Sequence, residues 1–160
     1  MDGPKKIKIT DPKAALAKAE HFCAYQERSQ QEVRDRLYEW GLWPDAVEQV
    51  ISQLIEGNFL NEDRFAKAYT KGKFSQKAWG RIKIKQGLKL KRVPDILIKK
   101  ALLTIDLDDY LAALTRLLDK KANTLTEKNQ LKRRYKLQQY AMSRGYEADL
   151  IADVLKASDL

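Results

Sequence analysis

The side chains with the clearest chemical potential in this sequence are cations in the middle of the chain. Eleven Lys and Arg residues lie between Arg64 and Pro94, with no Asp or Glu among them. Four of these cations recur at steps of four residues: Lys77, Arg81, Lys85 and Lys89. A helix beginning at Ser75 would align them in one stripe, where like charges repel by roughly 0.2 to 0.5 kcal/mol per pair. The pattern predicts a surface that binds a polyanion, because an ordinary solvated lysine face mixes both signs.

A second group of cations lies in the last third of the sequence. It comprises Lys128, Lys132, Arg133, Arg134, Lys136 and Arg144, and no acidic residue separates Lys128 from Tyr146. Basic clusters of this kind are typical of surfaces that bind phosphate. The candidate contacts to nucleic acid or to an acidic protein surface are therefore Lys71, Lys73, Lys77, Arg81, Lys83, Lys85, Lys89, Lys91, Arg92, Lys132, Arg133, Arg134, Lys136 and Arg144.

The net charge of the chain also indicates a polyanionic partner. The 160 residues carry 31 Lys and Arg against 22 Asp and Glu, a formal charge of +9 with a pI near 9.5. Residues 61–105 hold 13 basic and 3 acidic side chains, whereas the flanking thirds are close to neutral. Nucleic acid, an anionic membrane surface or an acidic protein would fit this charge, and the middle third should make the contact.

Few residues could support catalysis. His21 and Cys23 lie two residues apart and cannot share a helix face, so we expect a buried cysteine and a partly exposed histidine. Two acidic clusters could be proposed as Mg²⁺ ligands: Glu62 with Asp63, and Asp106 with Asp108 and Asp109. Both lie where a helix should begin, and helix capping explains them. Since phosphate-binding loops, dinucleotide turns and serine elbows are also absent from the sequence, we expect no enzyme activity, cofactor or metal.

Three features predict a cytoplasmic protein. Cys23 is the only cysteine, which excludes an intramolecular disulfide and fits a reducing compartment. No apolar run approaches the roughly 20 residues of a membrane span. Residues 1–10 lack the apolar core of a signal peptide, and we expect them to form a flexible tail.

Capping residues and helical spacing of apolar residues predict an all-α fold. Alternating, β-branched strand patterns are absent from the sequence. Each expected helix begins at a capping residue or a proline: Asp11, Ser29, Pro44, Asn61, Ser75, Pro94, Asp106, Thr124 and Glu147. Glu32 and Glu127 would complete capping boxes with Ser29 and Thr124. Gly41, Gly57 and Gly145 would end helices.

The aromatic residues are expected to pack in the core rather than to stack on bases. This applies to Trp40, Trp43, Phe65, Tyr69, Trp79, Tyr135 and Tyr140. For Trp79 the second role stays open, because this residue lies within the basic stretch.

The sequence repeats internally. Asp45, Asp95 and Asp149 fall 50 and 54 residues apart, each at the expected start of a third helix. Units of three helices are too small to bury their own apolar faces and stack on their neighbours. We therefore expect a curved, elongated, monomeric array of three three-helix repeats, at residues 11–58, 59–105 and 106–160. Two of its three middle helices would present cations in register.

Several motifs in this order resemble the RecX family, bacterial regulators of the RecA recombinase. They are S-x-x-E-V-x-x-x-L from Ser29 to Leu37, N-E-D-R-F-A at residues 61–66 after Leu54, Gly57 and Leu60, K-x-x-G-R-I from Lys77 to Ile82, and R-G-Y at residues 144–146 before an apolar helix. The resemblance covers residues 14–154. The family usually has Asp in place of Asn61 and Gly in place of Arg92, and the second difference removes a residue that easily adopts a left-handed turn after the basic helix.

The resemblance implies a non-enzymatic regulator that binds the groove of the RecA filament on single-stranded DNA. It further implies inhibition of recombinase activity in recombination, DNA repair and the SOS response. We expect the cations to face DNA phosphate, single- or double-stranded, and acidic RecA surface. Two alternatives stay open: a stand-alone DNA- or RNA-binding protein using one repeat as a helix-turn-helix, and, more remotely, a metal-dependent nuclease using Asp63.

Overall fold

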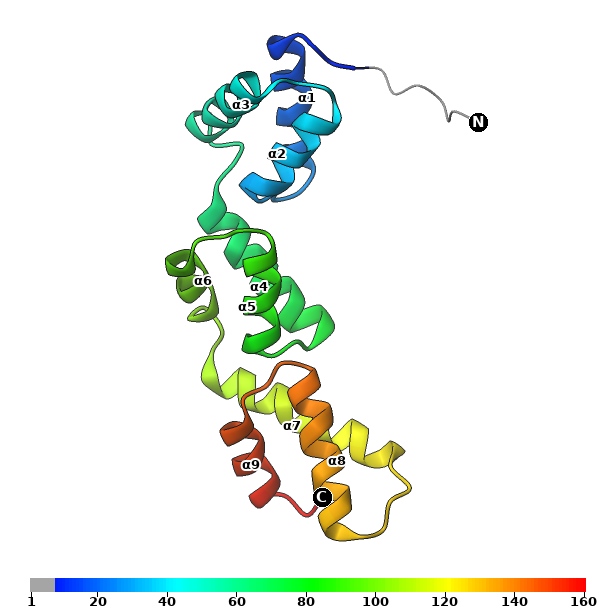
Figure 1. Cartoon of the computed structure of the whole chain (residues 1–160). Coiled ribbons are helices and arrows are strands. Elements are labelled where there is room, and N and C mark those ends of the chain that lie inside the picture. Colours follow the sequence, from blue (N-terminus) through cyan, green and yellow to red (C-terminus); the bar gives the residue numbers. More distant parts are fainter. Residues whose placement is uncertain (1–7) are drawn as a thin grey trace, which may run out of the picture.

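The computed structural model describes residues 8–160, and the regular structure in this range is entirely helical. The helices in this part of the chain are α1 (Pro12–Tyr25), α2 (Gln30–Glu39), α3 (Pro44–Glu56), α4 (Glu62–Lys77), α5 (Arg81–Leu90), α6 (Asp95–Leu102), α7 (Leu107–Thr124), α8 (Gln130–Ser143) and α9 (Ala148–Lys156). They form three groups of three, stacked end to end in a curved, elongated molecule (Figure 1). We call these groups repeat 1 (α1–α3), repeat 2 (α4–α6) and repeat 3 (α7–α9). The predicted all-α repeat array is confirmed.

Each repeat packs around a separate apolar core. Fully buried side chains at its centre include Leu37, Val47 and Leu54 in repeat 1, Ile84, Leu88 and Ile98 in repeat 2, and Leu114, Leu137 and Ile151 in repeat 3. Burying one such side chain stabilises the fold by about 1.5 to 3 kcal/mol. The expectation that a unit of three helices cannot bury its own apolar face is therefore wrong. Phe74 and Ile105 pack against the cores of both repeats 2 and 3.

Four predicted helix caps are confirmed by hydrogen bonds. The side chains of Asp11, Ser29, Asn61 and Asp106 accept from backbone N–H groups two or three residues further on. Such a cap contributes about 1 kcal/mol to helix stability. The first turns of α3, α6 and α9 contain the predicted acidic residues Asp45, Asp95 and Asp149, respectively.

The predicted cap at Ser75 is wrong. Helix α4 continues through Lys77, and the Ser75 hydroxyl donates within that helix to the Lys71 carbonyl at 2.6 Å. The chain turns only at Ala78, whose φ of 54° is left-handed, and α5 begins at Arg81. The expected single stripe is therefore divided, with Lys77 at the end of α4 and its other members on α5.

The predicted capping box at Thr124 is also wrong. Thr124 is the last residue of α7, and Asn129 caps α8 by accepting from the Lys132 N–H at 3.1 Å. Buried Leu118 and Ala122 lie four residues apart and continue the apolar face of α7 to its end. Burial of this face stabilises the last turns of α7, which includes Thr124 as its final residue.

The turns after the three middle helices share one backbone conformation. Gly41 and Gly145 have φ values of 101° and 96°, and Arg92 at the equivalent position has a φ of 58°. The turn at Arg92 is thus left-handed even without glycine. A side chain in this region costs roughly 1 to 2 kcal/mol of backbone strain.

The aromatic residues do not all pack as predicted. Phe65 is buried, Trp40, Tyr69 and Trp79 pack against the cores, and Tyr140 is half-buried. Trp43 and Tyr135, in contrast, are 49% and 62% exposed, so the core prediction is wrong for these two.

The residues singled out near the N-terminus are placed as follows. Cys23 is buried and His21 is exposed, as expected. Of the predicted flexible tail, residues 1–7 lie outside the described residues. Ile9 is fixed on repeat 1, because its N–H donates to the Trp40 carbonyl at 2.7 Å.

Candidate nucleic-acid interface

The joint between repeats 2 and 3 is made by main-chain hydrogen bonds at the start of α5. This helix has no side-chain cap. Repeat 3 satisfies its first amides: the Gly80 and Ile82 N–H groups donate to the carbonyls of Arg144 and Gly145 at 2.8 and 3.0 Å. The Arg81 N–H donates to the Tyr110 hydroxyl at 2.9 Å. The direction of α5, and of the cations on it, is thus fixed by the next repeat.

Arg81 belongs to this joint and is not a freely exposed cation. Its guanidinium pairs with Glu147 at 3.0 Å and lies 4.1 Å from the ring centroid of Tyr110. The Tyr110 hydroxyl donates to the same carboxylate, and its pKa is raised by burial and by this hydrogen bond. The Arg81 side chain is 29% exposed. The expectation that Arg81 lies on an open face is therefore wrong.

Arg144 is also engaged in the joint. It donates to the Lys77 carbonyl at 2.6 Å, and its buried Nε has no hydrogen-bond partner. The neighbouring Tyr146 donates to the Ala78 carbonyl at 3.0 Å and stacks on Tyr110 with ring centroids 5.0 Å apart. Burial raises the pKa of Tyr146 to about 12. Arg144 thus holds the end of α4.

The joint between repeats 1 and 2 uses ion pairs instead. Lys91 lies 2.6 Å from Glu32 in the first turn of α2, and Arg64 of α4 pairs with Glu27. Burial raises the pKa of Glu62, at the start of α4. Because Lys91 pairs with Glu32, its charge is already neutralised by a carboxylate of repeat 1.

The cations of repeat 3 do not form a continuous basic helix face. Arg133 turns inward and donates to the Ala122 carbonyl at 2.8 Å, at the end of α7. Lys136 pairs with Glu127 at 3.4 Å. Lys132 is exposed and Arg134 is half-buried. The prediction that two middle helices present matching rows of cations is wrong, because repeat 3 uses part of its row internally.

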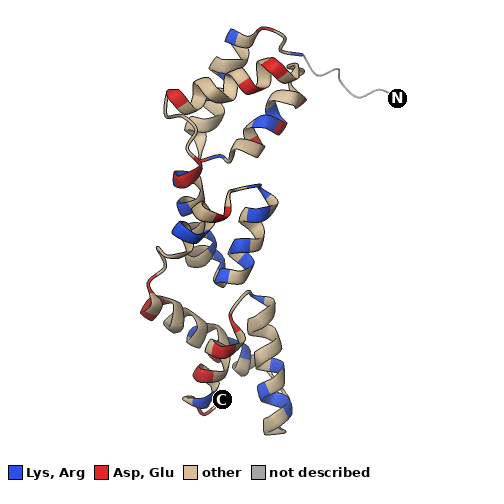
Figure 2. Ribbon diagram, turned by 60° about the vertical axis from the view of Figure 1, so that its left-hand side comes forward, with Lys and Arg blue, Asp and Glu red and all other residues tan. Residues whose placement is uncertain are grey.

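The remaining candidates concentrate on repeat 2. Figure 2 shows the blue Lys and Arg positions gathered over this repeat, whereas repeat 1 carries both colours. Of the predicted contacts on this repeat, those that are exposed and form no ion pair with the described residues are Lys71 and Lys77 on α4, Lys85 and Lys89 on α5, and Arg92 in the following turn. Lys73 and Lys83 are partly buried against the Trp79 ring, with Nζ 4.8 and 4.7 Å from its centroid.

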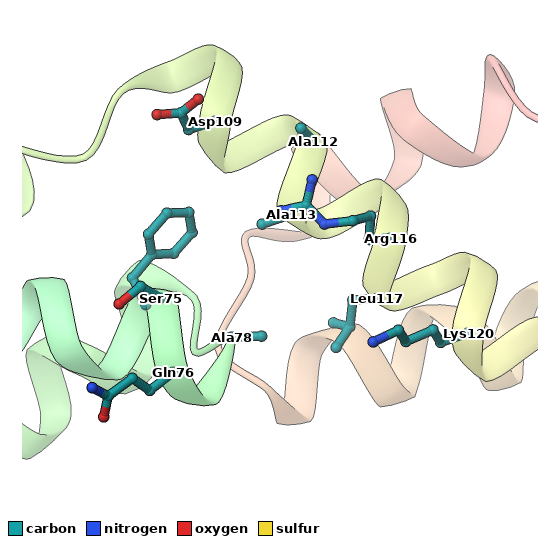
Figure 3. Close-up of a pocket in the computed structure, with 10 residues that line it drawn as sticks. Ser75, Gln76, Ala78, Asp109, Ala112, Ala113, Arg116, Leu117 and Lys120 are labelled. Atoms are coloured by element: carbon teal, nitrogen blue, oxygen red, sulfur yellow. The ribbon is translucent and has the colours of Figure 1, made fainter.

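Sequence reasoning missed further cations near this surface. Lys99 and Lys100 on α6 are exposed and continue the charge of repeat 2. Arg116 and Lys120 on α7 line a groove of about 490 Å³ beside Ser75 and the end of α4 (Figure 3). Their spacing of four residues is the available signal in the sequence, although Asp119 lies beside Lys120.

Residues of both acidic clusters have partners within their own helices. Among the described residues, no three His, Cys, Asp or Glu side chains lie together as metal ligands. Asp63 pairs with Lys67 at 3.0 Å, and Asp106 accepts from the Asp109 N–H at 3.0 Å. In residues 8–160, the helices are also too short or too polar to cross a membrane.

The fold and this charge distribution define a class of protein: a helical repeat protein with a strongly basic central repeat. Family profiles match all three repeats, namely the first, second and third three-helix domains of RecX at residues 15–54, 61–102 and 108–155. A regulatory protein RecX of Clostridium botulinum (strain Eklund 17B / Type B) is 31% identical over 158 residues, covering 95% of this chain and 74% of the relative. The chain belongs to the RecX family.

Other relatives agree with this assignment. The regulatory protein RecX of Clostridium perfringens (strain 13 / Type A) is 32% identical over 133 residues, which cover 81% of this chain. The aligned part spans only 61% of that relative's length. The crystal structure of RecX from Lactobacillus salivarius has the same fold, with a TM-score of 0.84, 22% identity, and coverage of 91% of this chain and 95% of that one. The family resemblance predicted from the motifs is confirmed, and the family is regulatory by name.

Proposed function

We propose that this protein inhibits the RecA recombinase by lying along the groove of the RecA filament on single-stranded DNA. The proposal rests on one observation above all: unpaired cations are concentrated on the central repeat of an elongated array. A curved array that bridges neighbouring filament subunits would place this repeat against DNA phosphate. Occupation of the groove would exclude duplex DNA and disturb the subunit contacts where ATP is hydrolysed.

Electrostatics would provide much of the affinity. Each phosphate that a lysine neutralises releases a counterion, which gives a log-log slope of affinity against salt of about −0.7 per contact on single strands. The residues available for this role are the exposed Lys71, Lys77, Lys85, Lys89 and Arg92. Phosphate contacts carry no base information, so binding should be nearly independent of sequence. No catalytic step is proposed for the protein itself.

The test is RecA ATPase activity and strand exchange on single-stranded DNA, with and without this protein. The variant Lys85→Glu, Lys89→Glu reverses two exposed cations of α5 and leaves the Arg81 ion pair intact. A matched control is Lys13→Glu, Lys156→Glu, which makes the same charge change at the exposed surface of repeats 1 and 3. We expect the first variant to lose inhibition of both activities in parallel and the control to retain it.

The alternative is a protein that binds nucleic acid without regard to RecA. It would inhibit only at concentrations that coat naked DNA, whereas a filament regulator should act well below them. Affinity for naked DNA and inhibition must be compared at one salt concentration, because screening acts on both. Inhibition confined to saturated DNA would refute the RecA-specific proposal, and full inhibition by the Lys85, Lys89 variant would refute the assigned surface.

A further inference from the structure

Two lysines of repeat 2 converge on one tryptophan ring. Lys73 lies on α4, Lys83 on α5 and Trp79 in the turn between these helices. The two Nζ atoms lie 4.8 and 4.7 Å from the centroid of the indole ring, and Lys73 also lies 5.5 Å from the ring centroid of Tyr69. Trp79 is partly buried against the core of repeat 2. The arrangement brings together cations that are ten residues apart in the sequence.

The backbone fixes both lysines in place. At the end of α4, the Ala78 N–H donates to the Phe74 carbonyl and the Trp79 N–H to the Lys73 carbonyl at 3.1 Å, around the left-handed Ala78. This left-handed C-cap brings the residue after the turn back against the last helical turn, and so places the indole beside Lys73. Lys83 is held from the other side, since its backbone packs closely against Gly145 of repeat 3.

The two ammonium groups remain available to a ligand. Neither forms an ion pair in the described part of the chain. An ammonium group has three N–H donors, and an aromatic face attracts the charge without saturating them. The acidic residues that share a groove with Lys73, Glu27 and Glu32, are already paired with Arg64 and Lys91. Two like charges held near one ring repel, and an anion that bridges them would remove this repulsion.

We propose that Lys73, Lys83 and Trp79 form a phosphate-binding subsite for the nucleic-acid backbone, in which Trp79 is a positioning residue that orients both lysines. The inference deepens the proposed function and depends on it. Exposed cations on the same two helices, including Lys77 and Lys85, extend the surface from this point, which favours a continuous polyanion over an isolated phosphate ion. With two ammonium groups against it, the indole orients cations and does not serve as a platform for a base.

The first test compares a lysine pair of repeat 2 with a pair outside it. Lys73→Gln, Lys83→Gln removes the subsite, and the matched control Lys13→Gln, Lys156→Gln removes the same charge from exposed positions on repeats 1 and 3. Affinity for fluorescent oligothymidine is measured by anisotropy over a range of salt concentrations. We expect the log-log slope of the first variant to become less negative by about 1.4, from two contacts of about 0.7 each, while the control keeps the parent slope. Equal slopes in both variants would overturn the proposal.

The second test concerns the indole. Trp79→Leu keeps both lysine charges but removes the ring that orients them, so it should weaken oligothymidine binding several-fold. Trp79→Phe should recover part of the affinity, because a phenyl face still attracts cations. Parent-like binding by a folded Trp79→Leu protein would contradict the positioning role. At equal ionic strength, inorganic phosphate should displace oligothymidine no better than chloride does, because the proposed ligand is a continuous polyanion. Specific displacement by phosphate would instead identify a site for the free ion.

Failure of this inference can be distinguished from failure of the proposed function. The RecA ATPase assay with the unmodified protein tests the function alone. If that protein inhibits but loss of Lys73 and Lys83 leaves the salt slope unchanged, only the subsite assignment is refuted. The unmodified protein could instead fail to inhibit RecA while loss of Lys73 and Lys83 still makes the salt slope less negative. In that case the subsite serves nucleic acid outside a RecA filament.

Discussion

Gly80 is the residue on which the joint between repeats 2 and 3 depends most directly, and Gly80→Ala should open that joint. The φ of Gly80 is −79°, which alanine adopts without strain. A Cβ atom at this position, however, would lie 2.3 Å from the Gly145 carbonyl oxygen and 2.6 Å from the Tyr146 nitrogen. Both neighbours are backbone atoms and cannot rotate away, so the repeats must separate.

The magnitude follows from the hydrogen bonds across the joint. Four neutral bonds connect the repeats there: the Gly80, Arg81 and Ile82 amides to repeat 3, and the Tyr146 hydroxyl to Ala78. At about 1 kcal/mol each, the loss of two to four of them would lower the free energy of unfolding by roughly 2 to 4 kcal/mol. For a chain of this length, each kcal/mol lowers the melting temperature by about 2 to 4 °C.

Gly72→Ala provides the matched control. Gly72 lies within α4, and a Cβ there would meet no atom within 4 Å. The same chemical change should stabilise the protein by about 0.5 to 1 kcal/mol, because glycine is a poor helix former. Urea unfolding followed by circular dichroism measures both variants. If Gly80→Ala were as stable as the parent, the close approach of Gly145 would not govern the joint.

Four further predictions address single sites. Arg92→Gly should stabilise the protein by up to about 1 kcal/mol in urea unfolding, since glycine relieves the left-handed strain but gains entropy when unfolded. Thr70→Val should be neutral or stabilising in thermal melts, because the fully buried Thr70 hydroxyl has no hydrogen-bond partner. Burial raises the pKa of Cys23 from 9.0 to about 11, so the unfolded thiol ionises first. The thiol contribution to stability should therefore be complete below pH 9 and decline as pH rises toward 11, while Cys23→Ala should show a smaller decline. Lys91→Gln should destabilise the joint with Glu32 by at most about 1 kcal/mol at low salt, a difference that should vanish in 1 M salt.

Much of the fold was predictable because its signals are local. Caps such as Ser29 and Asn61 act on amides three residues away, and apolar residues at helical spacing identify the buried faces. The repeat was visible because aspartate recurs at the start of each third helix. The positions that failed locally were Ser75 and Thr124, where the preceding helix continues through a residue that could have capped the next one.

The sequence by itself determined the helices, their repetition and the excess of positive charge in the middle third, since each depends on residue types at short spacing. Only the tertiary structure decided which cations are free. Arg81 and Arg144 bind partners 66 and 67 residues away, and a charge pattern along the chain carries no information about such distant carboxylates and carbonyls. The convergence of Lys73 and Lys83 on Trp79 likewise depends on how the turn at Ala78 folds α5 back beside α4.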